Sequence, residues 1–183
     1  SKWDSIAFLD DDENKTQVMN IKVIGKTSDV YKYINKYDIF VGIGNNYTRE
    51  RIQEHLEKLG ANIPVLIHPK AILGENVEVK QGTVIMAGAI INSCTRIGKG
   101  CIINTGVTID HDNIIDDYVH ISPGANLAGN VTVGKRTWIG IGSVVSNNVS
   151  IAGNSIIGAG SLVLKDIIEV GTYIGVPVRK LTK

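Results

Sequence analysis

A large aliphatic side chain recurs at every sixth position between residues 73 and 163, and the register never shifts. The residue four positions after each aliphatic is small, and only the last of these, Ile167, is larger than valine. The aliphatic positions are Leu73, Val79, Ile85, Ile91, Ile97, Ile103, Ile109, Ile115, Ile121, Leu127, Val133, Ile139, Val145, Ile151, Ile157 and Val163. A six-residue repeat of this kind predicts a parallel β-helix, in which each hexad forms one flat face and one corner.

Three hexads close one triangular coil, so the repeat predicts a prism of a little over five coils, about 25 Å tall. Glycine and asparagine are expected at the corners, where the backbone takes up positive φ. A β-sandwich, with a turn after about every 8–12 residues, would lose a six-residue register over this length. Apolar side chains at the outward final position of a hexad predict a subunit interface. They are Ile90, Ile102, Ile114, Trp138 and Ile156.

Residues 1–66 do not follow the hexad and are expected to alternate between strands and helices. We expect strands at 5–9, 38–43 and 64–67, a helix at 28–37, and a second helix that Thr48 caps and that ends at Leu59 before Gly60. This order predicts a small parallel sheet in an α/β, Rossmann-like domain. Ligands of such sheets bind beyond the carboxyl ends of the strands, where Asp10, Asp11, Gly44 and Asn45 are expected to lie. A turn with helix-capping aspartates is the alternative interpretation of Asp10 and Asp11.

A nucleotide-binding α/β unit normally begins with a strand and a glycine-rich turn. No such turn precedes the first expected strand. We therefore expect the N-terminal domain to be truncated here and a further βα unit to precede residue 1. Residues 67–166 form the predicted β-helix, and residues 167–183 its C-terminal cap. In the cap, Arg179 and Lys180 are either solvent-exposed charges or a site for phosphate groups.

Composition excludes several classes of protein. The 19 basic and 18 acidic residues nearly cancel, which argues against a nucleic-acid partner. No apolar run reaches the roughly 18 residues of a membrane helix, and no signal peptide is present, so a cytoplasmic protein without a membrane partner is expected. Two cysteines cannot form a disulfide framework.

Four histidines are the candidates for chemistry. His55 is expected on a helix surface, and His68 at the domain junction. His111 and His120 occupy outward positions of the repeat, and His111 is followed by Asp112. A histidine beside a carboxylate can act as a general base near neutral pH. Two other interpretations remain open, a zinc site with three histidine ligands shared between chains and a solenoid that binds without catalysis.

Several stretches narrow the choice of family. They are IAFLDDD, VGIGNN, LIHPKA, NTGVTIDHD, HISPGANLAGNVTVG, WIGIGS and GVPVRK. Together with the hexads they resemble the hexapeptide acyltransferases, in the branch of sialic-acid O-acetyltransferases and bacterial UDP-4-amino-sugar N-acetyltransferases. The resemblance implies a left-handed β-helix and direct acetyl transfer from acetyl-CoA, without a metal. The expected acceptor is the amino group of a UDP-linked 4-amino sugar, used for surface glycans, and a sialic-acid hydroxyl is the alternative.

The resemblance also assigns roles to single residues. His111 is the expected base and Asp112 orients it, although many relatives have glutamate there. His120, Gly129, Ile141 and Ala159 are expected to contact acetyl-CoA, and Asp10, Asp11, Gly44 and Asn45 to hold the nucleotide sugar. Gly129 is 18 residues, or one coil, beyond His111, so backbone N–H groups near it are candidates for the oxyanion donor.

His111 and His120 are nine residues apart, or half a coil, and are expected on different sides of one prism. A site that uses both therefore implies two chains. We expect a homotrimer with sites between subunits. The sequence alone does not separate N- from O-acetylation.

Overall fold

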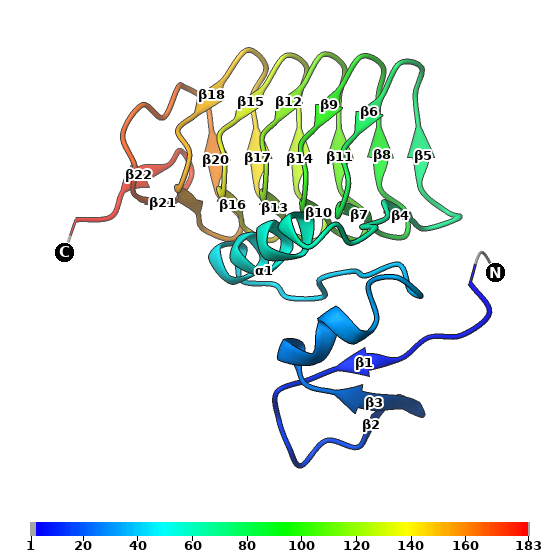
Figure 1. The fold of residues 1–183 in the computed structure, drawn as a ribbon. Coiled ribbons are helices and arrows are strands. Elements are labelled where there is room, and N and C mark those ends of the chain that lie inside the picture. The colour runs from blue at the N-terminus through cyan, green and yellow to red at the C-terminus, as the bar shows by residue number, and fades with distance from the viewer. Residues whose placement is uncertain (1–2, 183) are drawn as a thin grey trace.

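The computed structural model describes residues 3–182 and contains the predicted β-helix, with the N-terminal part packed along one side (Figure 1). Two-residue strands stack into three parallel sheets, named here by their first strand. The β4 sheet contains β4 (Leu66–Ile67), β7 (Val84–Ile85), β10 (Ile102–Ile103), β13 (His120–Ile121), β16 (Trp138–Ile139) and β19 (Ile156–Ile157). The β5 sheet contains β5 (Ile72–Leu73), β8 (Ile90–Ile91), β11 (Thr108–Ile109), β14 (Asn126–Leu127), β17 (Val144–Val145) and β20 (Leu162–Val163). The β6 sheet contains β6 (Glu78–Val79), β9 (Arg96–Ile97), β12 (Ile114–Ile115), β15 (Thr132–Val133) and β18 (Ser150–Ile151).

The hexad aliphatics form the core of the prism. From Ile85 to Val163 each of them is at most 2% exposed, and the small residues between them are buried as well. Strand pairs are separated by 18 residues, as in Ile102 with His120, which confirms three hexads per coil. Because every coil repeats the same packing, the large and small inward positions read from the sequence are confirmed.

The corners have positive φ, as expected. The corner between the β4 and β5 sheets has glycine in five successive coils, at Gly88, Gly106, Gly124, Gly142 and Gly160, whereas the first corner of this kind has Lys70. The corner between the β5 and β6 sheets takes the same backbone conformation with other residues, among them Cys94, Asp112 and Asn130. The positive φ is therefore a property of the coil, and residues other than glycine also adopt it.

The N-terminal part forms a mixed sheet, so the prediction of a parallel sheet from the strands at 5–9, 38–43 and 64–67 is wrong. Its order is β1 (Phe8–Leu9), β3 (Ile21–Gly25), β2 (Gln17–Val18), with β1 parallel and β2 antiparallel to β3. The hairpin of β2 and β3 was not expected from the sequence. The helix predicted at 28–37 is a short 3₁₀-helix, Thr27–Lys32. The strand predicted at 64–67 is β4, and it pairs with β7 in the β-helix.

The strand predicted at 38–43 is wrong. Its alternate residues do pack inward, since Ile39, Val41 and Ile43 contact the small core beneath the helix α1 (Asn46–Lys58). Within the part of the chain that the structure describes, no strand pairs with this segment, because the Ile39 N–H donates to Asn62 O and the Ile43 carbonyl accepts from the Arg49 guanidinium. An alternating pattern records which side chains are buried, whereas a strand also needs a paired backbone.

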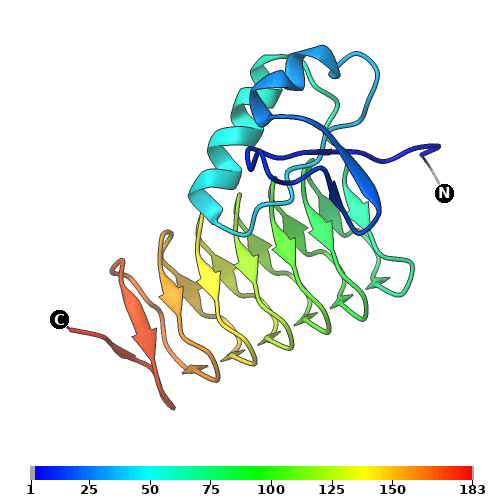
Figure 2. The same ribbon diagram turned by 90° about the horizontal axis from the view of Figure 1, so that it is seen from below.

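Helix α1 lies along the corner between the β6 and β4 sheets, as Figures 1 and 2 show. The N-terminal cap of α1 is Asn45, whose side chain accepts from the Thr48 N–H at 3.0 Å. The prediction of Thr48 as the cap is therefore wrong, because the helix begins before it. Arg49 is 1% exposed and donates to Gly100 O at 2.6 Å and to Tyr118 O at 3.1 Å on two successive coils. Its third nitrogen, Nη1, donates to the carbonyls of Ile43 and Gly44, so one guanidinium joins the loop before α1 to the prism.

The C-terminal residues close the last coil. Strand β21 (Thr172–Ile174) continues the β4 sheet, and β22 (Arg179–Lys180) pairs with it in the antiparallel direction. Lys180 forms an ion pair with Glu169 at 2.7 Å, and Arg179 is exposed. Within residues 3–182, no helix has the length and apolar character needed to cross a membrane.

Candidate active site

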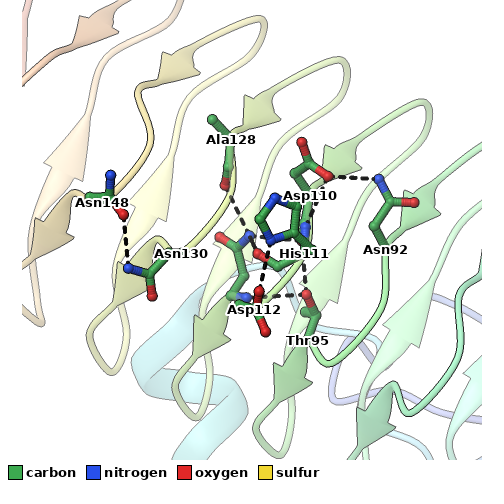
Figure 3. Close-up of polar contacts among 9 residues, drawn as sticks. Asn92, Thr95, Asp110, His111, Asp112, Ala128, Asn130 and Asn148 are labelled. Atoms are coloured by element: carbon green, nitrogen blue, oxygen red, sulfur yellow. Dashed lines mark hydrogen bonds and ion pairs between the residues drawn. The ribbon is translucent and has the colours of Figure 1, made fainter.

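The turn between β11 and β12 presents an imidazole between two carboxylates. The turn residue His111 is 60% exposed, and its Nδ1 lies 2.8 Å from Asp112 Oδ2. Asp110 accepts a hydrogen bond from the His111 backbone N–H at 2.9 Å and one from Asn92 on the preceding coil at 2.9 Å (Figure 3). Because a carboxylate can only accept, neutral His111 carries its proton on Nδ1 and leaves Nε2 with a free lone pair.

Both carboxylates raise the pKa of His111 above its ordinary value. The first cause is the hydrogen bond with Asp112, and the second is the negative charge of Asp110. The Asn92 amide and the His111 N–H lower the pKa of Asp110, which therefore stays ionised beside the ring. A more basic imidazole is a stronger proton acceptor, but it is protonated over a wider pH range.

Gly129 lies one coil beyond His111, in contact with its ring. A Cβ atom at residue 129 would be 2.7 Å from both Cε1 and Nε2 of His111. Equivalent positions in other coils hold Glu75, Ser93 and Asn147, so the coil itself tolerates larger side chains there. The predicted stacking of Gly129 against His111 is confirmed. Close contact with the imidazole ring explains why this position has glycine.

A groove of about 430 Å³ on the β5 sheet runs beside this turn. The outward side chains along it are mixed, with apolar Ile90 and Val144 and polar Thr108 and Asn126, and Asp110 also lines it. A substrate group in this groove would lie next to the imidazole and would be in contact with both apolar and polar atoms.

His120 lies on the outer face of the β4 sheet, in a different environment. Its ring stacks on Trp138 with centroids 5.5 Å apart, and its Nε2 lies 3.2 Å from Asn104 Nδ2. The Asn104 Oδ1 accepts from the Thr105 N–H, so its Nδ2 faces the ring and His120 Nε2 is the acceptor. Desolvation, followed by the charge of Arg49, lowers the pKa of His120 to about 4. His120 is therefore neutral near pH 7.

Comparisons with known proteins identify the family. Residues 1–56 match the family described as PglD N-terminal domain. The acetyltransferase domain of PglB from Neisseria gonorrhoeae is 36% identical and has a TM-score of 0.94, over 98% of this chain and 88% of that one. This chain belongs to the hexapeptide-repeat acetyltransferases.

Two further structures resemble this acetyltransferase along nearly its whole length. A mutant of perosamine N-acetyltransferase from Caulobacter crescentus, in complex with CoA and GDP-perosamine, is 32% identical with a TM-score of 0.93, over 97% of this chain and 85% of that one. WeeI from Acinetobacter baumannii is 27% identical with a TM-score of 0.89, over 96% of this chain and 85% of that one. The PglB domain has also been solved with acetyl coenzyme A.

The acetyltransferase brings some of the expected site residues together and separates others. His111, Asp112 and Gly129 form one cluster at the corner between the β5 and β6 sheets. His120 belongs to the β4 sheet, and Ile141 and Ala159 occupy the turns that follow β16 and β19 at the next corner. The expectation that His111 and His120 lie on different sides of one prism is confirmed.

The expected nucleotide-sugar residues all take structural roles as well. Asp10 accepts from the Asp12 N–H and pairs with Lys15, and Asp11 accepts from the Thr27 N–H at the start of the 3₁₀-helix. Asn45 caps α1, and Gly44 is exposed beside it. Because residues 38–43 are not a strand, Gly44 and Asn45 do not lie at the strand ends of one sheet with Asp10 and Asp11. Their binding role remains a prediction.

Sequence reasoning missed the residues that support the two histidines. Asp110 was visible as the first carboxylate of the Asp-His-Asp run, but only the folded turn shows that its carboxylate is held beside the ring. Asn104 contacts His120 across one coil, and Trp138, predicted at an interface, stacks on that ring. The five outward apolar residues lie on all three sheets, with Ile102, Trp138 and Ile156 in one column of the β4 sheet. Their role in a trimer stays a prediction.

Among residues 3–182, no three side chains of His, Cys, Asp or Glu are grouped as a metal ion would require. Cys101 is fully buried, and burial raises the pKa of its thiol to about 12.

Replacing Asp112 should shift the pH dependence of catalysis. In Asp112→Asn, the loss of the charged hydrogen-bond acceptor lowers the pKa of His111. A base is active when neutral, so the midpoint of kcat/KM against pH should move to lower pH. Part of the increase in the pKa of His111 remains, because the charge of Asp110 is still present. Asp116→Asn removes an exposed carboxylate elsewhere in the same coil and should leave the midpoint unchanged. An unchanged midpoint in Asp112→Asn would contradict the role of this pair.

Proposed function

We propose that this acetyltransferase transfers the acetyl group of acetyl-CoA to the amino group of a nucleotide-linked amino sugar, a UDP-4-amino sugar, with His111 as general base. The observation that carries the proposal is the His111 turn, where an exposed imidazole is held through Nδ1 and offers Nε2 to a substrate. The similarity to a perosamine N-acetyltransferase with CoA and GDP-perosamine bound supports a nucleotide-linked amino sugar as the acceptor.

The proposed reaction is a direct transfer. The acceptor nitrogen attacks the thioester carbonyl, and a C–N bond forms as His111 Nε2 takes a proton from that nitrogen. The C–S bond then breaks, and CoA leaves as a thiolate that takes up a proton. Asp112 stabilises the imidazolium formed on His111, because its carboxylate accepts the Nδ1–H in both protonation states.

The oxyanion of the tetrahedral intermediate needs a hydrogen-bond donor near the base. Around Gly129, the Ala128 N–H already donates to Val145 O and the Asn130 N–H to His111 O. The N–H of Gly129 itself is therefore our candidate donor.

Acetyl-CoA is proposed to contact His120, Gly129, Ile141 and Ala159. His120 is neutral and accepts from Asn104 through Nε2, so its Nδ1–H is available to donate to the cofactor. These residues occupy different sides of one prism, and in Figure 1 α1 lies along the lower side of the prism whereas the turns between the β5 and β6 sheets lie at its top. We therefore propose a homotrimer in which neighbouring chains complete each site, with Asp10, Asp11, Gly44 and Asn45 holding the nucleotide sugar.

Thiol release from acetyl-CoA tests the proposal. The acceptors are a UDP-4-amino sugar, the corresponding GDP-linked sugar and a sialic acid, each with His111→Ala as the blank. Release with a nucleotide amino sugar, and mass spectrometry showing an amide product, is the expected result. Release with sialic acid alone would replace the proposal with O-acetylation. If release occurs with the nucleotide sugars, the relative rates with the UDP-linked and GDP-linked acceptors identify the preferred nucleotide.

A further inference from the structure

Below the His111 turn, the prism contains a buried amide. Asn113 is fully buried and occupies the inward position that follows the corner between the β5 and β6 sheets. The same position in the other coils is occupied by Val77, Thr95, Val131 and Val149. Asparagine is the largest polar side chain at any small inward position of the repeat, and it lies in the coil that carries His111.

The inward threonines of the repeat share one hydrogen bond. Their hydroxyl donates to the carbonyl fifteen residues later, as Thr83 does to Gly98 at 2.7 Å and Thr137 to Ala152 at 3.1 Å. Asn113 makes the same bond, to Ala128 O at 2.9 Å. Its Nδ2 also lies 2.8 Å from Asp110 O and 3.1 Å from His111 O, so one amide contacts two carbonyls of the catalytic turn.

These extra contacts are not needed to satisfy the backbone. The Asp110 carbonyl also accepts from Thr95 Oγ1 at 2.8 Å, and the His111 carbonyl accepts from the Asn130 N–H at 2.9 Å. Meanwhile Asn113 Oδ1 is buried without a hydrogen-bond partner among the described residues, which is destabilising. A threonine would make the common bond without burying an unpaired oxygen. Stability of the coil therefore does not explain the asparagine.

We propose that Asn113 is a positioning residue for His111, because its amide holds the carbonyls of Asp110 and His111 from inside the prism and fixes the turn that presents the ring between its two carboxylates. This inference rests on the proposed role of His111 in catalysis. The charged groups facing the ring are Asp110 and Asp112 of its own turn. In the two neighbouring coils, the equivalent turn positions are uncharged. Ser93 and Gly129 align with His111, and Cys94 and Asn130 align with Asp112.

The test replaces Asn113 with residues that the repeat already accepts. Asn113→Thr keeps the bond to Ala128 and removes both contacts to the turn, and Asn113→Val copies Val131 in the next coil. Thr83→Val removes a buried inward hydroxyl far from His111 and serves as the control for stability. We would measure kcat, the KM of each substrate, thermal unfolding, and the titration of His111 by NMR in histidine-labelled protein, with His111→Ala to assign the signal.

In Asn113→Thr we expect kcat to fall about 10-fold or more, since small displacements of a catalytic group have large effects on rate. Both KM values should stay within about twofold, because neither substrate touches Asn113. The His111 titration should move to lower pH as its contacts with the carboxylates loosen, while Thr83→Val changes only the unfolding temperature. A His111 titration and kcat equal to those of the unchanged protein would overturn the proposal.

The two proposals can fail separately. Full activity of His111→Ala would reject His111 as the base, and the NMR titration would still decide whether Asn113 positions the ring. Loss of activity in Asn113→Thr with an unchanged titration would also overturn the proposal, because the ring would then be correctly placed.

Discussion

Replacing His111 with alanine should reduce kcat by about 10²- to 10⁴-fold, the usual contribution of a general base. The side chain is 60% exposed and makes its ring contact with Asp112, so its loss removes little packing. The fold, the unfolding temperature and acetyl-CoA binding should therefore remain near those of the unchanged protein. Steady-state thiol release measures the loss of kcat, and calorimetry measures whether acetyl-CoA binding is retained.

A matched histidine variant provides the control. His55 is exposed on α1, and His55→Ala should have normal turnover. His111→Gln keeps a polar side chain of similar size but cannot act as a base near neutral pH, so it should be as inactive as alanine. Turnover within about threefold of normal in either His111 variant would reject this residue as the base, because general-base catalysis contributes more than that.

Adding a single methyl group at Gly129 should have the second largest effect. In Gly129→Ala the new Cβ would be 2.7 Å from His111 Cε1 and Nε2, too close for the ring to keep its position. The exposed imidazole can move away, so the cost falls on its placement and the fold is retained. A displacement of about 1 Å can lower the rate by about 100-fold. We expect a loss of kcat of about 10- to 100-fold with little change in unfolding temperature.

A double mutant separates this effect from a general disturbance of the coil. If Gly129→Ala acts only through the ring, it should cause no further loss of activity in the His111→Ala background. Asn147→Ala changes the equivalent turn position one coil further on and should have normal activity. Additive losses in the double mutant would show that Gly129 acts independently of His111, for example through its backbone N–H.

Much of the fold was predictable because each hexad repeats the same local packing. The six-residue period was enough to predict the inward aliphatics from Ile85 to Val163, the three-hexad coil and the positive-φ corners. Coil geometry also predicted that Gly129 lies over His111 and that His120 lies on another side. Such relations follow from counting along the chain, because stacked coils place residues 18 positions apart in contact.

The N-terminal part was less predictable because it has no repeat. Residues 38–43 alternate like a strand, yet their backbone bonds go to Asn62 and Arg49 instead of a neighbouring strand. The burial of Arg49 against Gly100 and Tyr118 joins segments more than 50 residues apart and left no local signal. Local patterns report burial, but the pairing of backbone groups is decided by the whole chain.

The sequence by itself determined the β-helix, its register and the choice of His111 and Asp112 as candidates, since these depend on spacing and residue type. Only the tertiary structure decided how each histidine is tuned. The carboxylates of Asp110 and Asp112 raise the pKa of His111, whereas burial beside Asn104 and Trp138 lowers that of His120. It also decided that Asn113 supports the turn from within, because only the closed coil brings a buried amide to the carbonyls of Asp110 and His111.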